Sequence, residues 1–207
     1  MRPDFVYLAS LSPRRRQLLE QIGVSFQVLS VEIDESIGAA ELPLGYVKRL
    51  AAAKAAAGLR QSEARGSMAR PVLAADTAVV IDGEVLGKPQ SGEDGQRMLR
   101  LLSGRTHEVL TAVALATASG LESRVSRSEV TFRAIDAAEA RDYWHTGEPR
   151  DKAGGYAIQG YGAVFVAGLR GSYSGVMGLP LYETAEFLRS VGVSPWQPGT
   201  VGGDDEH

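Results

Sequence analysis

The spacing of apolar residues along the chain alternates between the patterns of strands and of helices. Residues 4–9 and 26–31 are short apolar runs without a helical period, which predicts two strands. Between them, Ser12-Pro13 offers a cap and a first-turn proline, so we expect a helix there. A second helix is predicted over residues 42–59, because the apolar residues fall on one face and alanine is frequent.

The rest of the chain continues this alternation and adds two hairpin signals. Residues 71–81 are the most strand-like run, and Asp82-Gly83 predicts a tight turn into a short strand at residues 84–86. A polar loop is expected at residues 61–70. The remaining predicted elements are helices at residues 93–102, 136–144 and 180–191 and strands at residues 109–117, 129–135 and 163–167, with a turn at Ser119-Gly120. Because strands and helices are mixed along the chain and two hairpins are expected, we predict an α/β fold with a mixed sheet.

Length and composition bound the class of protein. The 207 residues contain no internal repeat and fit one α/β domain, which we place at residues 1–193. Residues 194–207 carry proline, glycine and acids, so we expect a disordered tail there. The chain has no cysteine, which excludes disulfides and thiolate metal sites. Without a signal peptide or an apolar run of membrane-spanning length, a cytoplasmic protein with no membrane partner is expected.

The charge balance narrows the choice of ligands. The net charge is −3, and the chain shows no stripe of aromatic residues on which bases could stack, so nucleic acid is not expected as a partner. Phosphate chemistry would therefore require a local cluster of basic residues.

Such a cluster opens the first predicted helix. Residues 10–16 read SLSPRRR, and the unpaired N–H groups of a helix N-terminus attract phosphate. Arginine adds bidentate donors that match phosphate oxygens. Cations in a first helical turn oppose the helix dipole, which favours a functional role over the alternative of a surface helix with three solvated arginines.

Two acidic features could supply a base or metal ligands. Asp76 interrupts a run of small and β-branched residues, where aspartate is rare and costly unless it is paired, binds metal or lines a cleft. The alternative is an aspartate that ends a strand or makes a turn. Residues 31–35, VEIDE, concentrate acids after a strand and could bind Mg²⁺ or Mn²⁺. A solvated acidic loop is the alternative.

Two lysines and a glycine-rich segment complete the candidates. Lys54 lies among alanines that leave room for a close approach, and Lys88 lies in GKP; each could instead be a surface residue. Residues 151–162, DKAGGYAIQGYG, permit a tight loop or a close backbone approach to a ligand, or form a plain turn with a bulge. No GxxxxGK[ST] or GxGxxG motif occurs in a suitable place. The histidines lack metal-ligand spacing, and no serine has the context of a nucleophile.

In this order and at these separations, the segments resemble the Maf family. The resemblance covers nearly the whole chain and rests on LASLSPRR (8–15), the acids ending at Glu35, LAAAKA (50–55), LAADTAVV (73–80), GEVLGKP (83–89), LSGRTHEVLTAV (102–113), DKAGGYAIQG (151–160) and GSYSGVMGLPLYET (171–184). It implies a mixed, twisted sheet flanked by helices, with two lobes around a deep cleft, similar to the inosine-triphosphate pyrophosphatases. It also implies metal-dependent attack of water on the α-phosphorus of a nucleoside triphosphate, with Mg²⁺, Mn²⁺ or Co²⁺, and a homodimer.

The resemblance implies a role for each matching residue. Asp76 is the catalytic base and a metal contact, and Glu35 helps to hold the metal. The residues expected to contact the triphosphate are Ser12, Arg14, Arg15, Lys54 and Lys88.

The resemblance also points to the pyrimidine branch of the family. The branch that hydrolyses dTTP and UTP resembles this chain at Asp76-Thr77 and at IQG (158–160), whereas the 7-methyl-GTP branch has Gln and Glu at the two positions. A neutral Gln159 amide can pair with the O4/N3 edge of uracil or thymine, so Thr77 and Gln159, with Arg14, are assigned to base selection. The alternatives are a pyrophosphatase for another nucleotide, such as 7-methyl-GTP or a modified pyrimidine, and a nucleotide-binding regulator of septum formation.

Overall fold

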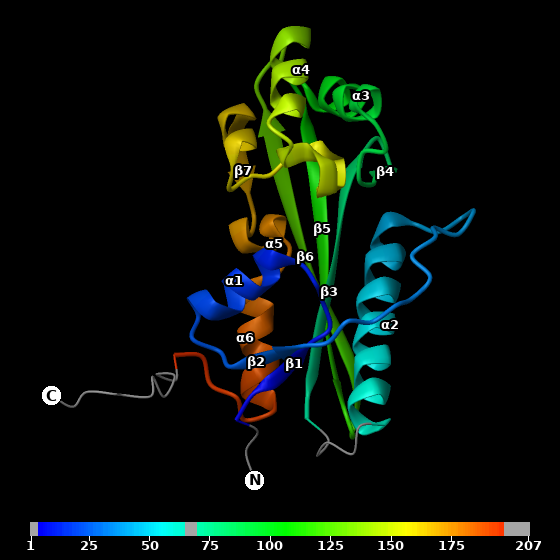
Figure 1. Ribbon diagram of the computed structural model, residues 1–207, viewed down its shortest axis with the longest axis vertical. Coiled ribbons are helices and arrows are strands. Elements are labelled where there is room, and N and C mark those ends of the chain that lie inside the picture. Colours follow the sequence, from blue (N-terminus) through cyan, green and yellow to red (C-terminus); the bar gives the residue numbers. More distant parts are fainter. Residues whose placement is uncertain (1–3, 65–69, 197–207) are drawn as a thin grey trace, which may run out of the picture.

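Three long strands run the length of the molecule. They are β3 (Val72–Ile81), β5 (Thr106–Thr117) and β6 (Gly120–Phe132). In the computed structural model, which describes residues 4–64 and 70–196, these strands pair antiparallel in the order β3-β5-β6 (Figure 1). Apolar and small residues fill almost every position of β3 and β5, because helices cover both faces of the sheet there.

Shorter strands extend this sheet on both sides. The four are β1 (Val6–Leu8), β2 (Phe26–Val28), β4 (Glu84–Leu86) and β7 (Val166–Arg170). The order is β2-β1-β3-β5-β6-β7, with β4 paired to β3 outside this path. Strand β1 is parallel to both β2 and β3, whereas the other pairs are antiparallel. The predicted α/β class with a mixed sheet is confirmed.

Strand β3 is only partly covered along one edge. Its first residues, Val72 and Leu73, pair with β1, and the N–H of Ala9 donates to the Leu73 carbonyl at 2.8 Å. Its last residues, Val79–Ile81, pair with β4. Among the strands that the structure describes, none pairs with residues 74–78 on that edge. Asp76 lies in the middle of this uncovered stretch.

Helix α2 (Pro43–Ala64) covers one face of the sheet (Figure 1). On the opposite face, two apolar clusters divide the molecule into two lobes, called here the near lobe, which contains α1, and the far lobe, which contains α3 and α4. The near lobe packs α1 (Pro13–Gln21) and α6 (Leu181–Ser190) against β1 and one half of β3 and β5. The far lobe contains α3 (Gly92–Leu102), α4 (Ala137–His145) and the 3₁₀ helices η1 (Glu148–Asp151), η2 (Ala153–Gly155) and η3 (Tyr161–Phe165). Helix α5 (Tyr173–Met177) lies between the lobes (Figure 1).

Several boundaries differ from those predicted. Helix α2 continues to Ala64 instead of ending near residue 59, because Ser62 continues its buried stripe. Strand β6 begins at Gly120, although a strand was expected only from residue 129; its first half contains mostly polar residues and its inward positions include serines. The strand expected at residues 163–167 is shifted to Val166–Arg170, and α5 was not predicted.

The predicted domain limits stay predictions. Most of the tail expected at residues 194–207 falls outside the described residues, as does part of the 61–70 loop. No helix in the described ranges is long and apolar enough to cross a membrane.

Small residues let α2 approach the sheet closely. Its buried stripe includes Ala51, Ala55 and Gly58, and the strands present alanines to it, including Ala74 and Ala112. A Cβ on Gly58 would lie 2.8 Å from Val72 Cγ1 and 3.1 Å from Ala9 Cβ. The glycine therefore sets the distance between the helix and strands β1 and β3.

This packing predicts opposite effects for the same substitution at two positions of α2. Gly58→Ala gains about 1 kcal/mol of helix propensity but overpacks the sheet at a cost of about 1–3 kcal/mol, so a net loss of stability near 1 kcal/mol is expected. Gly45→Ala meets only Glu41 Cγ at 4.0 Å and should raise stability by a few tenths of a kcal/mol. Urea unfolding measures both variants, and a gain of stability in Gly58→Ala would contradict the packing argument.

Candidate active site

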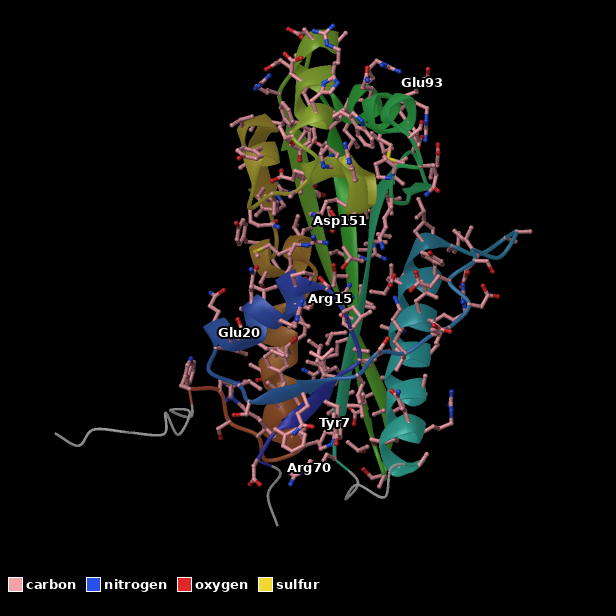
Figure 2. The ribbon with its side chains drawn as sticks, viewed as in Figure 1. Tyr7, Arg15, Glu20, Arg70, Glu93 and Asp151 are labelled. Carbon is pink, nitrogen blue, oxygen red and sulfur yellow. The ribbon has the colours of Figure 1, made fainter. Side chains whose placement is uncertain are left out.

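A cavity of about 640 Å³ lies at the uncovered edge of β3 and between the two lobes. All of the predicted site residues line it: Ser12, Arg14, Arg15, Glu35, Lys54, Asp76, Thr77, Lys88 and Gln159. Figure 2 shows Arg15 on the near lobe and Asp151 on the far lobe, both close to the centre of the molecule. The structure thus brings together residues that are far apart in the sequence.

Lys54 bridges the two acidic candidates. Its Nζ donates to Asp76 Oδ1 at 2.8 Å and lies 2.6 Å from Glu35 Oε1. Asp76 is only 8% exposed, and a buried carboxylate requires such a partner. Lys54 can reach Asp76 because the small residues of α2 hold the helix close to β3.

The charges around Glu35 favour its ionised form. Burial acts to raise the pKa of Glu35, but the hydrogen bond from Lys54 and the charges of Lys54, Lys88 and Arg15 act in the opposite direction. The net result is a pKa below the ordinary value of a glutamate. Glu35 is therefore a carboxylate that can bind a cation near neutral pH.

The loop that carries Glu35 is fastened to α2. The Tyr46 hydroxyl donates to the Glu35 carbonyl at 3.0 Å, and Arg49 donates to the Ser36 carbonyl at 2.8 Å. Arg49 also binds Glu41 through both oxygens, which lowers the pKa of Glu41 to about 2. The same helix thus holds Lys54 and, through this loop, Glu35.

Asp76 and Thr77 point to opposite faces of β3, as consecutive strand residues do. Asp76 faces α2, and Thr77 lies beneath Arg15, whose Nη2 is 3.4 Å from the Thr77 hydroxyl. Thr111 Oγ1 lies 3.0 Å from Thr77 Oγ1 and donates to the Gly175 carbonyl at 2.7 Å. The single proton of the Thr111 hydroxyl thus faces two acceptors, Thr77 Oγ1 and the Gly175 carbonyl, and Thr77 Oγ1 also accepts from Arg15.

Two arginines of α1 face the cavity from the near lobe. Arg15 donates to the Gly178 carbonyl at 2.7 Å and to Ser10 Oγ at 3.1 Å, and Arg14 lies 3.8 Å from an Asp151 oxygen. Burial lowers the pKa of both arginines, whereas the nearby carboxylates raise it, Asp76 for Arg15 and Asp151 for Arg14. Guanidinium groups stay protonated in proteins, so both remain cations.

The far lobe supplies the other side of the cavity. Lys88 follows β4, and Gln159 lies in the glycine-rich loop; both side chains are exposed. Among the polar residues that line the cavity, Tyr46 and Gln90 were not predicted, and Ser10, Asp151, Lys152 and Tyr156 were included only as parts of longer candidate segments. Asp151 and Lys152 begin the DKAGG block and contact one another, so that block was the available signal.

The acidic residues fit a metal ion that the substrate helps to hold. Within residues 4–64 and 70–196, no group of three or more His, Asp or Glu side chains is arranged to hold a metal ion. Asp76 and Glu35 nevertheless contact one ammonium group, so their oxygens are neighbours. Mg²⁺ commonly binds through one or two carboxylates together with substrate phosphates and water.

A buried histidine supports the far-lobe wall. His107 is 2% exposed, and its Nε2 lies 2.9 Å from the hydroxyl of Tyr156, which lines the cavity. Its Nδ1 is buried without a hydrogen-bond partner among the described residues. Burial lowers the pKa of His107 to about 4, so the ring is neutral at neutral pH.

Fold and site together define an α/β protein with a cleft suited to a phosphorylated ligand. The sequence model described as Maf-like protein matches residues 5–191, and the chain belongs to this family. The resemblance inferred from the sequence blocks is confirmed.

Several relatives match over almost the full chain. A dTTP/UTP pyrophosphatase of Saccharophagus degradans is 55% identical over 192 residues, which are 93% of this chain and 91% of the relative. A dTTP/UTP pyrophosphatase of Alkalilimnicola ehrlichii is 53% identical, with 91% and 95% covered. Among solved structures, the Ham1 protein of Staphylococcus aureus matches with a TM-score of 0.43 and 15% identity, over 64% of this chain and 72% of that one.

The neutral His107 predicts a specific loss of stability in acid. Its pKa is about 4 in the folded protein against 6.5 ordinarily, so between these values the unfolded chain takes up a proton that the folded protein does not. Stability therefore falls as the pH falls, by about 2 kcal/mol from this residue between pH 7 and pH 5. His107→Gln keeps a partner for Tyr156 but does not titrate, so its urea midpoint should depend less on pH. Equal pH dependence in both proteins would contradict the assignment.

Proposed function

We propose that this protein is a nucleoside triphosphate pyrophosphatase that hydrolyses dTTP and UTP to the nucleoside monophosphate and pyrophosphate. The observation that carries the proposal is the contact of Lys54 with both Asp76 and Glu35 inside a cavity lined by Arg14, Arg15 and Lys88. The names of the relatives support the same substrates.

Asp76 is proposed as the general base. Lys54 binds its Oδ1, which leaves the second oxygen to accept a proton from the attacking water. The water oxygen forms a bond to the α-phosphorus, and the bond from that phosphorus to the oxygen bridging the α- and β-phosphates breaks. That bridging oxygen leaves with pyrophosphate, so no covalent enzyme intermediate is required.

Asp76 and Glu35 are also proposed to hold a divalent cation. When bound there, Mg²⁺, Mn²⁺ or Co²⁺ would polarise a phosphoryl oxygen and favour deprotonation of water. Lys54 lies between the same carboxylates and balances their charge in the absence of the ion.

The cations of both lobes are proposed to bind the triphosphate. Negative charge accumulates on phosphoryl oxygens and on the leaving pyrophosphate in the transition state. Groups already aimed at these oxygens stabilise it without reorganisation. The proposed contacts are Ser12, Arg14, Arg15, Lys54 and Lys88.

The pyrimidine ring of the nucleotide is proposed to lie on the Thr77 face of β3. This part of the cavity includes the apolar residues Val79, Val109 and Met177, which can pack against a base. Gln159 offers one acceptor and two donors to the O4/N3 edge of uracil or thymine, and Thr77 and Arg14 complete the selection. The nucleotide would then cross the uncovered edge of β3, with its phosphates beside Asp76.

The resemblance and the composition also support expectations about the oligomeric state, the location and the partners of the protein. We expect a homodimer that acts in the cytoplasm on free nucleotides, without nucleic acid or membrane as a partner.

Replacing the proposed general base Asp76 should abolish turnover while the protein still folds. Asp76→Asn is expected to lower kcat for UTP by about 10²–10⁴-fold, the range of general-base catalysis. Asp142→Asn, at an exposed position of α4, is the matched control and should retain full activity. Pyrophosphate release with Mg²⁺ or Mn²⁺ measures both, and in ¹⁸O-labelled water the label should enter the monophosphate. Full turnover by Asp76→Asn, or label only in pyrophosphate, would overturn the mechanism.

Selection of the nucleobase should depend on Gln159 and on Thr77, which lies on the face of β3 opposite to Asp76. The double variant Thr77→Gln, Gln159→Glu loses the hydroxyl between Arg15 and Thr111 and the amide donor to the base. Its kcat/KM for UTP is expected to fall by about tenfold or more, since a polar group left unpaired costs about 1–3 kcal/mol. The preference among UTP, dTTP, CTP and 7-methyl-GTP is the measurement. An unchanged preference would remove Thr77 and Gln159 from base selection.

A further inference from the structure

A hydrogen-bonded pair lies behind the far-lobe wall of the cavity. The hydroxyl of Tyr143, on α4, donates to Glu148 Oε1 at 2.7 Å. Tyr143 is 5% exposed, and Glu148 is half-buried at the start of η1. Neither side chain lines the cavity, so neither is placed to touch a substrate.

This pair holds both ends of one short turn. The turn runs from Ala157 to Gly160, whose N–H donates to the Ala157 carbonyl at 3.2 Å. The N–H of Ala157 donates to the Tyr143 hydroxyl at 3.2 Å. Just beyond the turn, the N–H groups of Tyr161 and Gly162 donate to Glu148 at 3.0 and 2.9 Å. Gln159 is the third residue of the turn and is exposed to the cavity.

Two glycines allow the pair to approach the backbone this closely. A Cβ on Gly160 would lie 1.9 Å from Glu148 Oε2, and a Cβ on Gly162 would lie 2.7 Å from the Tyr143 hydroxyl. No side chain could occupy either place without moving the carboxylate or the phenol. The glycines of the IQGYG segment therefore serve this contact.

The hydrogen bonds of the pair are of the strong kind. A carboxylate that accepts from a hydroxyl and two backbone N–H groups forms charge-assisted bonds. Burial, and then the hydrogen bond to Glu148, raise the pKa of Tyr143, so the hydroxyl keeps the proton that it donates. The turn is thus fixed to α4 and η1 by these hydrogen bonds.

We propose that Tyr143 and Glu148 are positioning residues for base selection: together they fix the turn that presents the Gln159 amide to the pyrimidine. The inference rests on the proposed role of Gln159. It adds residues outside the cavity to the determinants of specificity, because an amide on an unfixed turn would pair with several bases almost equally well.

Selectivity measurements test this role. CTP carries an amino group in place of O4, so the ratio of kcat/KM for UTP to that for CTP reports base selection. In Tyr143→Phe and Glu148→Gln this ratio should fall by about tenfold, mainly through a higher KM for UTP, with kcat within about twofold. Ser103→Ala is the control, because it removes the far-lobe hydrogen bonds to Ile135 without touching the turn; its ratio should equal that of the wild type.

A double-mutant cycle separates positioning from general loosening of the lobe. Gln159→Ala alone should lower the UTP/CTP ratio, and adding Tyr143→Phe should then lower it no further, because the positioned group is already gone. Independent, multiplying losses would overturn the inference. If Gln159→Ala keeps the wild-type ratio, the proposed role of Gln159 fails, and with it the positioning role.

Hydrogen exchange gives a readout that does not depend on activity. The amides of Tyr161 and Gly162 should exchange at least about tenfold faster in Glu148→Gln than in the wild type or Ser103→Ala. Unchanged exchange would overturn the inference even if the enzyme hydrolyses UTP as proposed. A reduced ratio in Gln159→Ala with a wild-type ratio in Tyr143→Phe would overturn the positioning role alone.

Discussion

The uncovered edge of β3 between β1 and β4 is the constraint on which the rest of the structure depends. A strand with neighbours on both edges can be approached by a ligand only across its faces, because the edges carry the backbone pairing. Among the strands that the structure describes, residues 74–78 have a neighbour on one edge only, and Asp76 in this stretch is part of the sheet and also lines the cavity. The two lobes lie beyond the ends of this stretch, and both supply cations to it.

Strand geometry would then separate the two proposed tasks, hydrolysis and selection of the nucleobase. Because consecutive residues of β3 face opposite ways, Asp76 meets Lys54 and Glu35 on the α2 side, whereas Thr77 meets Arg15 and Thr111 on the other. Chemistry on one face and base selection on the other would allow each to be altered without disturbing the other. Arg15 lies close to both residues, since it contacts Thr77 and the charge of Asp76 acts to raise its pKa.

The α/β class with a mixed sheet could be predicted from the sequence, and the residues predicted for the site line one cavity, whereas several element boundaries could not be predicted. Asp76 and the arginines of α1 interrupt their local patterns, an aspartate inside a strand and cations in a first helical turn, and such exceptions point to function. Residues 120–128 of β6 were missed because their inward positions include Ser126 and Ser128, which carry no apolar period. The pairing of Tyr143 with Glu148 depends on how α4, η1 and the glycine-rich turn meet in space, which local pattern does not encode.

The nucleotide is proposed to cross the uncovered edge of β3. A crystal structure of Asp76→Asn with UTP and Mn²⁺ tests this proposal most directly, because the variant should bind the intact substrate. The α-phosphate is expected beside position 76 on the α2 side, and the uracil edge is expected against Gln159 on the other side. A uracil packed on the α2 side, or a triphosphate bound away from Lys54 and Glu35, would contradict the proposal.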